Sequence, residues 1–163
     1  MTNGLLDITS STIRVAALSG SLRAASINTA LLREIAARAP EWFAVELVPL
    51  GGLPLFNPDL EAELPEAVAA FRADIGAADG LIIASPEYAH GVSGVLKNAL
   101  DWLVGYDGFA GKPVLILNAA PRARHGITAL REILSTMAAR IVEGIPLIEA
   151  IAQTRQEGFS HAA

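Results

Sequence analysis

The chain has 163 residues, of which 52% are hydrophobic and 18% are charged, a composition that excludes a disordered protein and predicts one folded domain over residues 1–163. The formal net charge of -5 argues against nucleic acid as a partner, because non-specific binding to a phosphate backbone needs a basic face. The absence of cysteine excludes disulfides, thiol catalysis and cysteine-based metal sites, and no metal site is predicted.

The stretch from Met1 to Thr12 is mostly polar and lacks the continuous apolar core of a secretory signal. The longest apolar stretches elsewhere are strand-sized and far shorter than a bilayer span. We therefore expect a cytoplasmic protein with no membrane partner.

The first two predicted strands flank an amphipathic helix. Ile13 to Leu18 is a short apolar run that predicts a strand, and Ser26 is a suitable N-cap for a helix that ends before Pro40. Val45 to Leu50 predicts the second strand. Apolar residues recur every four positions in the helix, which marks its buried side: Ile27, Leu31 and Ile35.

A loop rich in glycine and proline follows, from Gly51 to about Pro65. The next helix carries its apolar residues at helical spacing, at Leu64, Val68, Phe71 and Ile75. Leu81 to Ala84 is a compact apolar run, typical of a strand that is covered on both faces. Ser93 is the expected N-cap of a third helix with a stripe at Leu96, Leu100 and Leu103.

Three further elements complete the pattern. Pro113 to Leu117 predicts another buried strand, and Ala139 to Val142 a fifth. Between them lies the clearest amphipathic helix, with apolar residues at Leu130, Ile133, Leu134 and Met137. Ile148, Ile151 and Ala152 fit a short last helix. Strands alternate with helices throughout, which predicts an α/β fold with a parallel sheet and helices on both faces.

Ligands of such sheets bind beyond the carboxyl ends of the strands, which selects the loops Ser19–Ser26, Ser85–Gly91 and Asn118–Gly126. The first loop combines hydroxyls, the Arg23 guanidinium and a helix N-terminus, a set that favours a bound phosphate. In the second loop, Tyr88 can flank an aromatic ring and His90 can hydrogen-bond a ring edge.

Other phosphate and nucleophile motifs are incomplete. No G-x-G-x-x-G follows the first strand, so a dinucleotide-binding start is not expected. Tyr106 and Pro113 stand where a P-loop needs glycine and Ser/Thr, and Val95 replaces the last glycine of a nucleophile elbow.

The paired loop motifs are typical of one family. Leu18 to Arg23 with Ser26-Ile27-Asn28, Ser85-Pro86-Glu87-Tyr88, and Gly94 to Trp102 resemble the NADPH-dependent FMN reductase family, which includes quinone, chromate and azo-dye reductases. The resemblance implies a flavodoxin-like, doubly wound five-stranded parallel sheet of order 2-1-3-4-5. It also implies an FMN site made by Ser19, Ser21, Arg23, Ser26 and Asn28 around the phosphate, and by Pro86, Glu87, Tyr88, His90 and Gly91 along the isoalloxazine. Ile27 and Asn118 complete the predicted cofactor-binding set.

The resemblance further implies NADPH, or NADH, as co-substrate, a small electron acceptor such as a quinone, free flavin, azo compound or chromate, and a homodimer or homotetramer. The reaction needs no protein acid or base, so no catalytic residue is predicted. Alternatives are a non-enzymatic flavin-binding or electron-transfer protein, a hydrolase on a related scaffold, and an inactive paralogue.

Two features depart from the family. The third loop carries Arg122, Arg124 and His125, which either contact the phosphates of the nicotinamide dinucleotide or face solvent. The chain also ends early, and if Ile145 to Glu157 does not cover the sheet, an apolar patch remains.

Overall fold

The predicted alternation of strands and helices is present in the computed structural model, which describes residues 12–120, 122, 124–143 and 147–161. The remaining residues, including two of the third loop, lie outside the described residues. The strands of the main sheet are β1 Ile13–Ser19, β2 Phe43–Leu47, β3 Gly80–Ala84, β6 Pro113–Leu117 and β7 Arg140–Val142. The helices are α1 Ile27–Arg38, α2 Glu66–Ala77, α3 Gly94–Asp101, α4 Arg124–Thr136 and α5 Leu147–His161.

The five main strands form one parallel sheet of order β2-β1-β3-β6-β7. Counted along the chain, this is the expected order 2-1-3-4-5, so the predicted fold is confirmed. In the register, Ser19 lies opposite Ala84, and Ala84 lies opposite Leu117. The three central strands therefore end at the same level, and the loops that follow them meet at one edge of the sheet.

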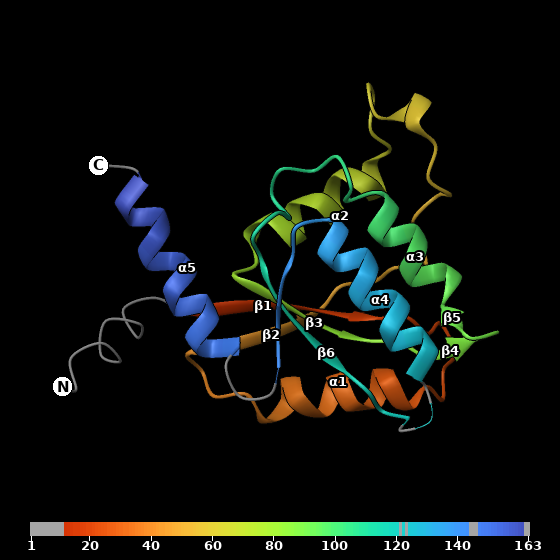
Figure 1. Cartoon of the computed structure of the whole chain (residues 1–163), viewed down its shortest axis with the longest axis horizontal. Helices are drawn as coiled ribbons and strands as arrows, with labels where there is room; N and C mark the ends of the chain where they lie inside the picture. The colour runs from red at the N-terminus through yellow and green to blue at the C-terminus, as the bar shows by residue number, and fades with distance from the viewer. Residues whose placement is uncertain (1–11, 121, 123, 144–146, 162–163) are drawn as a thin grey trace.

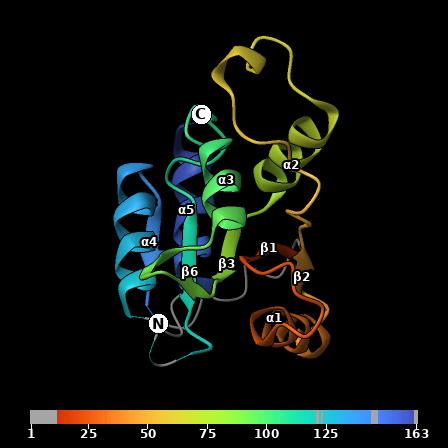
Figure 2. The same cartoon turned by 90° about the vertical axis from the view of Figure 1, so that its right-hand side faces the viewer.

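Helices cover both faces of the sheet, with α2, α3 and α4 on one side and α1 on the other (Figures 1 and 2). A hydrophobic core lies on each face of the sheet, and successive strand residues point into one or the other. Leu18 packs with α2–α4, while Ala17 packs with the helices of the opposite face. Leu147 and Ile151 of α5 belong to this second core. Helix α5 thus covers part of this face of the sheet, and no apolar patch is left at these two positions.

Two predicted elements needed correction. The buried side of α1 is formed by Asn28 and Leu32, whereas Ile27 is 61% exposed. A polar residue occupies a buried position here, so hydrophobic spacing alone placed the stripe one residue early. The second strand is Phe43–Leu47 rather than Val45–Leu50; Val48 and Leu50 are buried but follow the strand as extended loop.

The long loop between β2 and α2 contains one 3-10 turn, Pro58–Leu60, and is attached to α3 by side chains. The Asn98 amide accepts a hydrogen bond from Phe56 N at 2.8 Å and donates one to Pro54 O at 2.9 Å. The Trp102 indole N–H donates to the same carbonyl at 2.8 Å. Asn98 and Trp102 of the segment Gly94 to Trp102 therefore stabilise the attachment of this loop.

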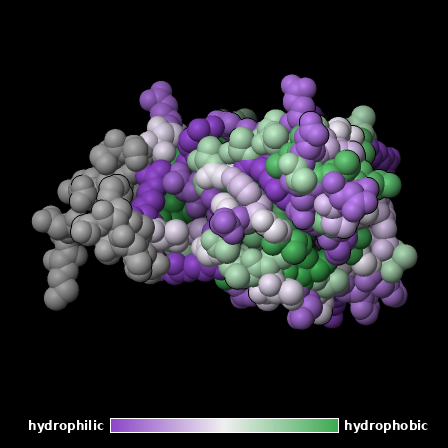
Figure 3. Space-filling model, turned by 90° about the horizontal axis from the view of Figure 1, so that it is seen from above, coloured by the Kyte–Doolittle hydropathy of each residue, from purple (hydrophilic) through white to green (hydrophobic). Residues whose placement is uncertain are grey.

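Among the described residues, no helix is long and apolar enough to span a bilayer. Seen from the α2–α4 side, hydrophilic and hydrophobic residues are intermixed over the surface (Figure 3).

Candidate functional site

A cleft of about 450 Å³ lies at the carboxyl edge of the sheet, where the loops after β1, β3 and β6 meet. It is lined by Ser21, Arg23, Ala25, Ser26, Ile27, Asn28, Pro86, Glu87, Tyr88, Ala120 and Arg122. Its size falls within the range of ligand pockets for cofactor-sized molecules, about 300–1,000 Å³. The three loops selected from the sequence thus share one cavity.

The loop after β1 is held in shape by its own hydroxyl groups. Ser26 caps α1 by accepting a hydrogen bond from Thr29 N at 3.2 Å, as predicted. The Ser19 hydroxyl lies 2.7 Å from that of Thr29, and the Ser21 hydroxyl accepts a long bond of 3.4 Å from Arg23 N. All three serine hydroxyls therefore serve the loop, and the Ser21 hydroxyl, which acts there as an acceptor, keeps its own O–H donor for a ligand.

The cleft wall made by the start of α1 has the properties of an anion site. A helix leaves its first N–H groups without intrahelical acceptors. Thr29 N and Ala30 N bond to Ser26, which leaves the amides of Ile27 and Asn28 at the cleft. The positive end of the helix dipole adds to this. The exposed guanidinium groups of Arg23 and Arg122 line the same cavity.

Gly20 lets the loops after β1 and β3 approach each other. Its N–H donates to Ala84 O at 2.9 Å. A Cβ atom at this position would lie 2.4 Å from the Ser85 hydroxyl oxygen and 2.8 Å from that of Ser93. Only glycine fits this contact, which fixes the spacing between the two cleft walls.

The loop after β3 contains a small hairpin that the sequence did not predict, made of β4 Glu87–Tyr88 and β5 Gly91–Val92. Ala89 and His90 connect the two strands with φ angles of 48° and 59°, both in the left-handed region. This matches a two-residue turn of type I′, which normally carries glycine or asparagine. The tight turn presents Tyr88, 58% exposed, at the cleft.

Glu87 connects the hairpin to α4. Its carboxylate accepts a hydrogen bond of 2.7 Å from Gly126 N, in the first turn of the helix. A negative charge is favourable at this end of a helix. The short distance between the hairpin and the helix depends on Gly126, where a Cβ would lie 3.2 Å from Glu87 Cβ.

Four of the residues predicted to bind the cofactor lie outside the lining of this cleft. Ser19 lines a separate, smaller cavity of about 220 Å³ beside Thr29. The His90 ring stacks on His125, with centroids 4.3 Å apart, and Gly91 belongs to the far strand of the hairpin. Asn118 accepts a hydrogen bond from Ala120 N at 3.0 Å and shapes the third loop.

The cleft also contains residues that the predicted set omits. Ala25 and Ala120 line it through small side chains that carry no chemical signal, and only their place after a strand could have indicated them. For Arg122 the sequence leaves two roles open, contact with the phosphates of the nicotinamide dinucleotide or exposure to solvent. In the structure, Arg122 lines the cleft. Arg124 and His125 belong to the first turn of α4, so the third loop is shorter than Asn118–Gly126.

Comparisons with known proteins agree with this geometry. The sequence model of the family described as NADPH-dependent FMN reductase matches residues 13–153. The chain belongs to the NADPH-dependent FMN reductase family. It is 45% identical over 111 residues to an NAD(P)H-dependent FMN reductase of Pseudomonas aeruginosa, covering 66% of this chain and 60% of that protein. It is 41% identical over 111 residues to a 2-hydroxy-1,4-benzoquinone reductase of Burkholderia sp, covering 66% and 61%.

A solved structure of the same fold is FerB, a flavoenzyme NAD(P)H:(acceptor) oxidoreductase from Paracoccus denitrificans. It superposes with a TM-score of 0.75 at 27% identity, covering 93% of this chain and 94% of FerB. The chain spans about 60% of the length of the two curated relatives named above.

The cleft of this FMN reductase family member suits a phosphate that is joined to a polyol. The side-chain oxygen of Asn28 is buried and has no hydrogen-bond partner among the described residues. A buried unsatisfied oxygen is costly, and a ligand hydroxyl would supply the missing donor. FMN carries a phosphate and, next to it, the hydroxyls of its ribityl chain. The residues at the first loop therefore fit the cofactor that the family description names.

Replacing Glu87 with glutamine is expected to lower the free energy of unfolding by about 0.5–1 kcal/mol, because glutamine keeps an acceptor for Gly126 N but removes the charge at the start of α4. Urea denaturation of the cofactor-free protein measures the change. Glu132→Gln, an exposed position on the same helix, is the matched control and should change stability by less than about 0.5 kcal/mol. Equal midpoints for the two variants would contradict the helix-capping role.

Proposed function

We propose that the protein is an NAD(P)H-dependent oxidoreductase that holds FMN in the carboxyl-edge cleft and passes electrons from the nicotinamide to a small acceptor such as a quinone. The observation that carries the proposal is the anion site at the start of α1, which shares one cavity with the exposed ring of Tyr88. Relatives named as FMN and quinone reductases support it. When bound, FMN supplies the redox chemistry, accepting a hydride and releasing electrons.

The residues of the chain bind and orient the cofactor. The amides of Ile27 and Asn28 and the Arg23 guanidinium hold the phosphate. The Tyr88 side chain, carried by the hairpin, flanks the flavin ring. Glu87 fixes the hairpin to α4 through Gly126 N, and so keeps Tyr88 in place. These roles require binding and positioning only, and no side chain has to move a proton.

Assembly and location form part of the same proposal. Leu22, Ile27 and Tyr88 are each more than half exposed near the cleft, and a second copy of the chain would cover such side chains in a homodimer or homotetramer. The absence of cysteine is compatible with a reducing cytoplasm.

One cuvette experiment tests the activity. After incubation with FMN and removal of free FMN by desalting, the protein is expected to retain flavin absorbance, to lose it on adding NADPH, and to recover it on adding a quinone. Because one cleft serves both substrates in turn, initial-rate lines against the two substrates should be parallel. Flavin binding without NADPH oxidation would favour the electron-transfer alternative, and failure to bind FMN would refute the proposal.

A further inference from the structure

A second cleft lies at the opposite, amino edge of the sheet. It has a volume of about 490 Å³. Its walls come from the residues before β3, the segment before β6, the start of β7 and helix α5. The lining residues are Ala78, Asp79, Gly108, Ala110, Gly111, Lys112, Pro113, Arg140, Ile151, Thr154 and Arg155. None of them lines the FMN cleft described above.

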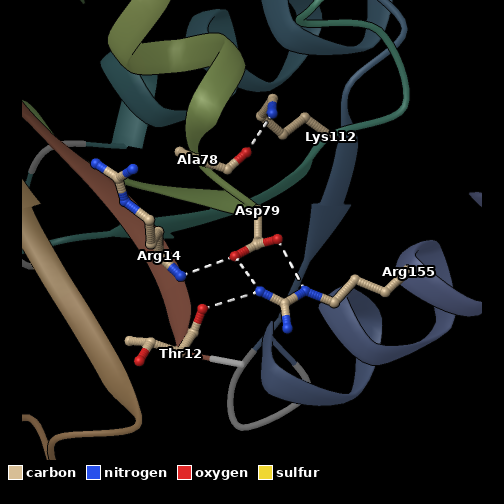
Figure 4. Close-up of polar contacts among 6 residues, drawn as sticks. All are labelled: Thr12, Arg14, Ala78, Asp79, Lys112 and Arg155. Carbon is tan, nitrogen blue, oxygen red and sulfur yellow. Dashed lines mark hydrogen bonds and ion pairs between the residues drawn. The ribbon is translucent and has the colours of Figure 1, made fainter. Parts of the chain in front are cut away.

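Of the described residues that line this cleft, one carries a carboxylate, Asp79, and it is already engaged. Asp79 accepts two hydrogen bonds from the Arg155 guanidinium, at 2.8 and 2.6 Å, and one from Arg14 N at 2.7 Å. Figure 4 shows this carboxylate between Arg14 and Arg155. Asp79 and Arg155 therefore neutralise each other, and the remaining charge of the cleft comes from the other two basic residues.

Lys112 and Arg140 have no such ion pair within the part of the chain that the structure describes. The Lys112 ammonium donates to Ala78 O, and the Arg140 guanidinium donates to the Gln153 amide oxygen; both partners are neutral. Among the described residues, neither cation lies within ion-pair distance of a carboxylate. Two cations without an ion-pair partner among the described residues thus share one cavity in a protein whose formal net charge is -5.

The partial burial of Lys112 makes it costly for its ammonium to have no ion-pair partner. Desolvation lowers the pKa of its amine below the ordinary value, and the nearby Asp79 carboxylate offsets this only in part. An ammonium group has three donors, and the single bond to Ala78 O leaves two for another acceptor. An anion in the cleft would satisfy these donors and restore the pKa.

We propose that the amino-edge cleft binds a phosphate-bearing small molecule, whose phosphate is held by Lys112 and Arg140. A guanidinium fork and an ammonium point charge together match the two charges of a phosphate monoester, whereas a single carboxylate would leave one cation unpaired. The cavity is larger than a phosphate alone, and its apolar wall of Pro113 and Ile151 suits an attached organic group.

The test uses the fact that the chain has two lysines, Lys97 and Lys112. The protein is labelled with ¹³C at lysine Cε, saturated with FMN, and titrated with inorganic phosphate and, separately, with adenosine monophosphate. We expect both probes to shift the Lys112 signal and raise its pKa, while Lys97, paired with Asp101 on α3, does not respond. Equal affinity for the probes identifies free phosphate as the ligand, and tighter binding of the nucleotide identifies a phosphorylated metabolite.

Two variants localise the effect, and calorimetric titration measures their affinities because Lys112→Met carries no Lys112 signal. Lys112→Met and Arg140→Met should each weaken phosphate binding by about tenfold or more, because each removes a charge-assisted hydrogen bond. Lys97→Met is the matched control and should bind as the unaltered protein does. A Lys112 signal that does not move at saturating phosphate, or unchanged affinity in Lys112→Met, would overturn the proposal. The signal of the unaltered protein decides the outcome even if a variant folds poorly.

Discussion

Arg23→Ala is expected to weaken FMN binding by roughly tenfold to one-hundredfold, the loss that follows when a hydrogen-bonded charged partner of a phosphate is removed. Arg23 lines the cleft beside the start of α1, and its carbonyl accepts a bond of 3.1 Å from the N-cap residue Ser26. Arg23 therefore shares the cleft with Ile27 and Asn28, whose amides form the anion site. Quenching of flavin fluorescence on titration with FMN measures the affinity.

Two further variants separate the specific contact from charge alone. Arg38→Ala removes an arginine at the other end of α1 that is paired with Glu34, and it should leave FMN affinity unchanged. Arg23→Lys keeps the charge but loses the planar fork, so an intermediate affinity is expected. If Arg23→Ala binds FMN as tightly as Arg38→Ala does, the phosphate does not sit at this loop.

The fold could be predicted because the buried strands leave a strong signal. The run Leu81 to Ala84 is buried on both faces, which only the middle of a covered sheet requires. The order of the strands came from the family resemblance rather than from periodicity. The buried side of α1 was misplaced because Asn28, a polar residue, is buried at the cleft, and the spacing of apolar residues does not mark such a position.

The candidate site was predicted only in part, for a related reason. Loop motifs identified Arg23 and Tyr88, whose side chains carry recognisable chemistry. The hairpin that presents Tyr88 gave no signal, because Ala89 and His90 adopt left-handed angles without the residues that such turns prefer. The stacking of His90 on His125 joins segments 35 positions apart in the sequence, and spacing along the chain does not show such a contact.

Gly20→Ala is expected to lower the free energy of unfolding by about 1–3 kcal/mol, the usual cost of forcing extra volume into a filled contact. The added methyl would lie 2.4 Å from the Ser85 hydroxyl oxygen and 2.9 Å from Ser85 Cβ. A hydroxyl can rotate away, but Cβ is fixed to the backbone, so the loops after β1 and β3 must separate. The same change should weaken FMN binding, because both loops line the cleft.

Thermal unfolding with and without FMN measures both effects, and Gly52→Ala is the control. A Cβ at Gly52 meets nothing within 4 Å, so this variant should be nearly neutral. Ser85→Gly introduced into Gly20→Ala removes the two Ser85 contacts and should restore part of the lost stability. Recovery of FMN affinity in the same double variant would show that the contact with Ser85 causes the lost affinity. A Gly20→Ala protein as stable as Gly52→Ala would mean that the two loops are not in close contact.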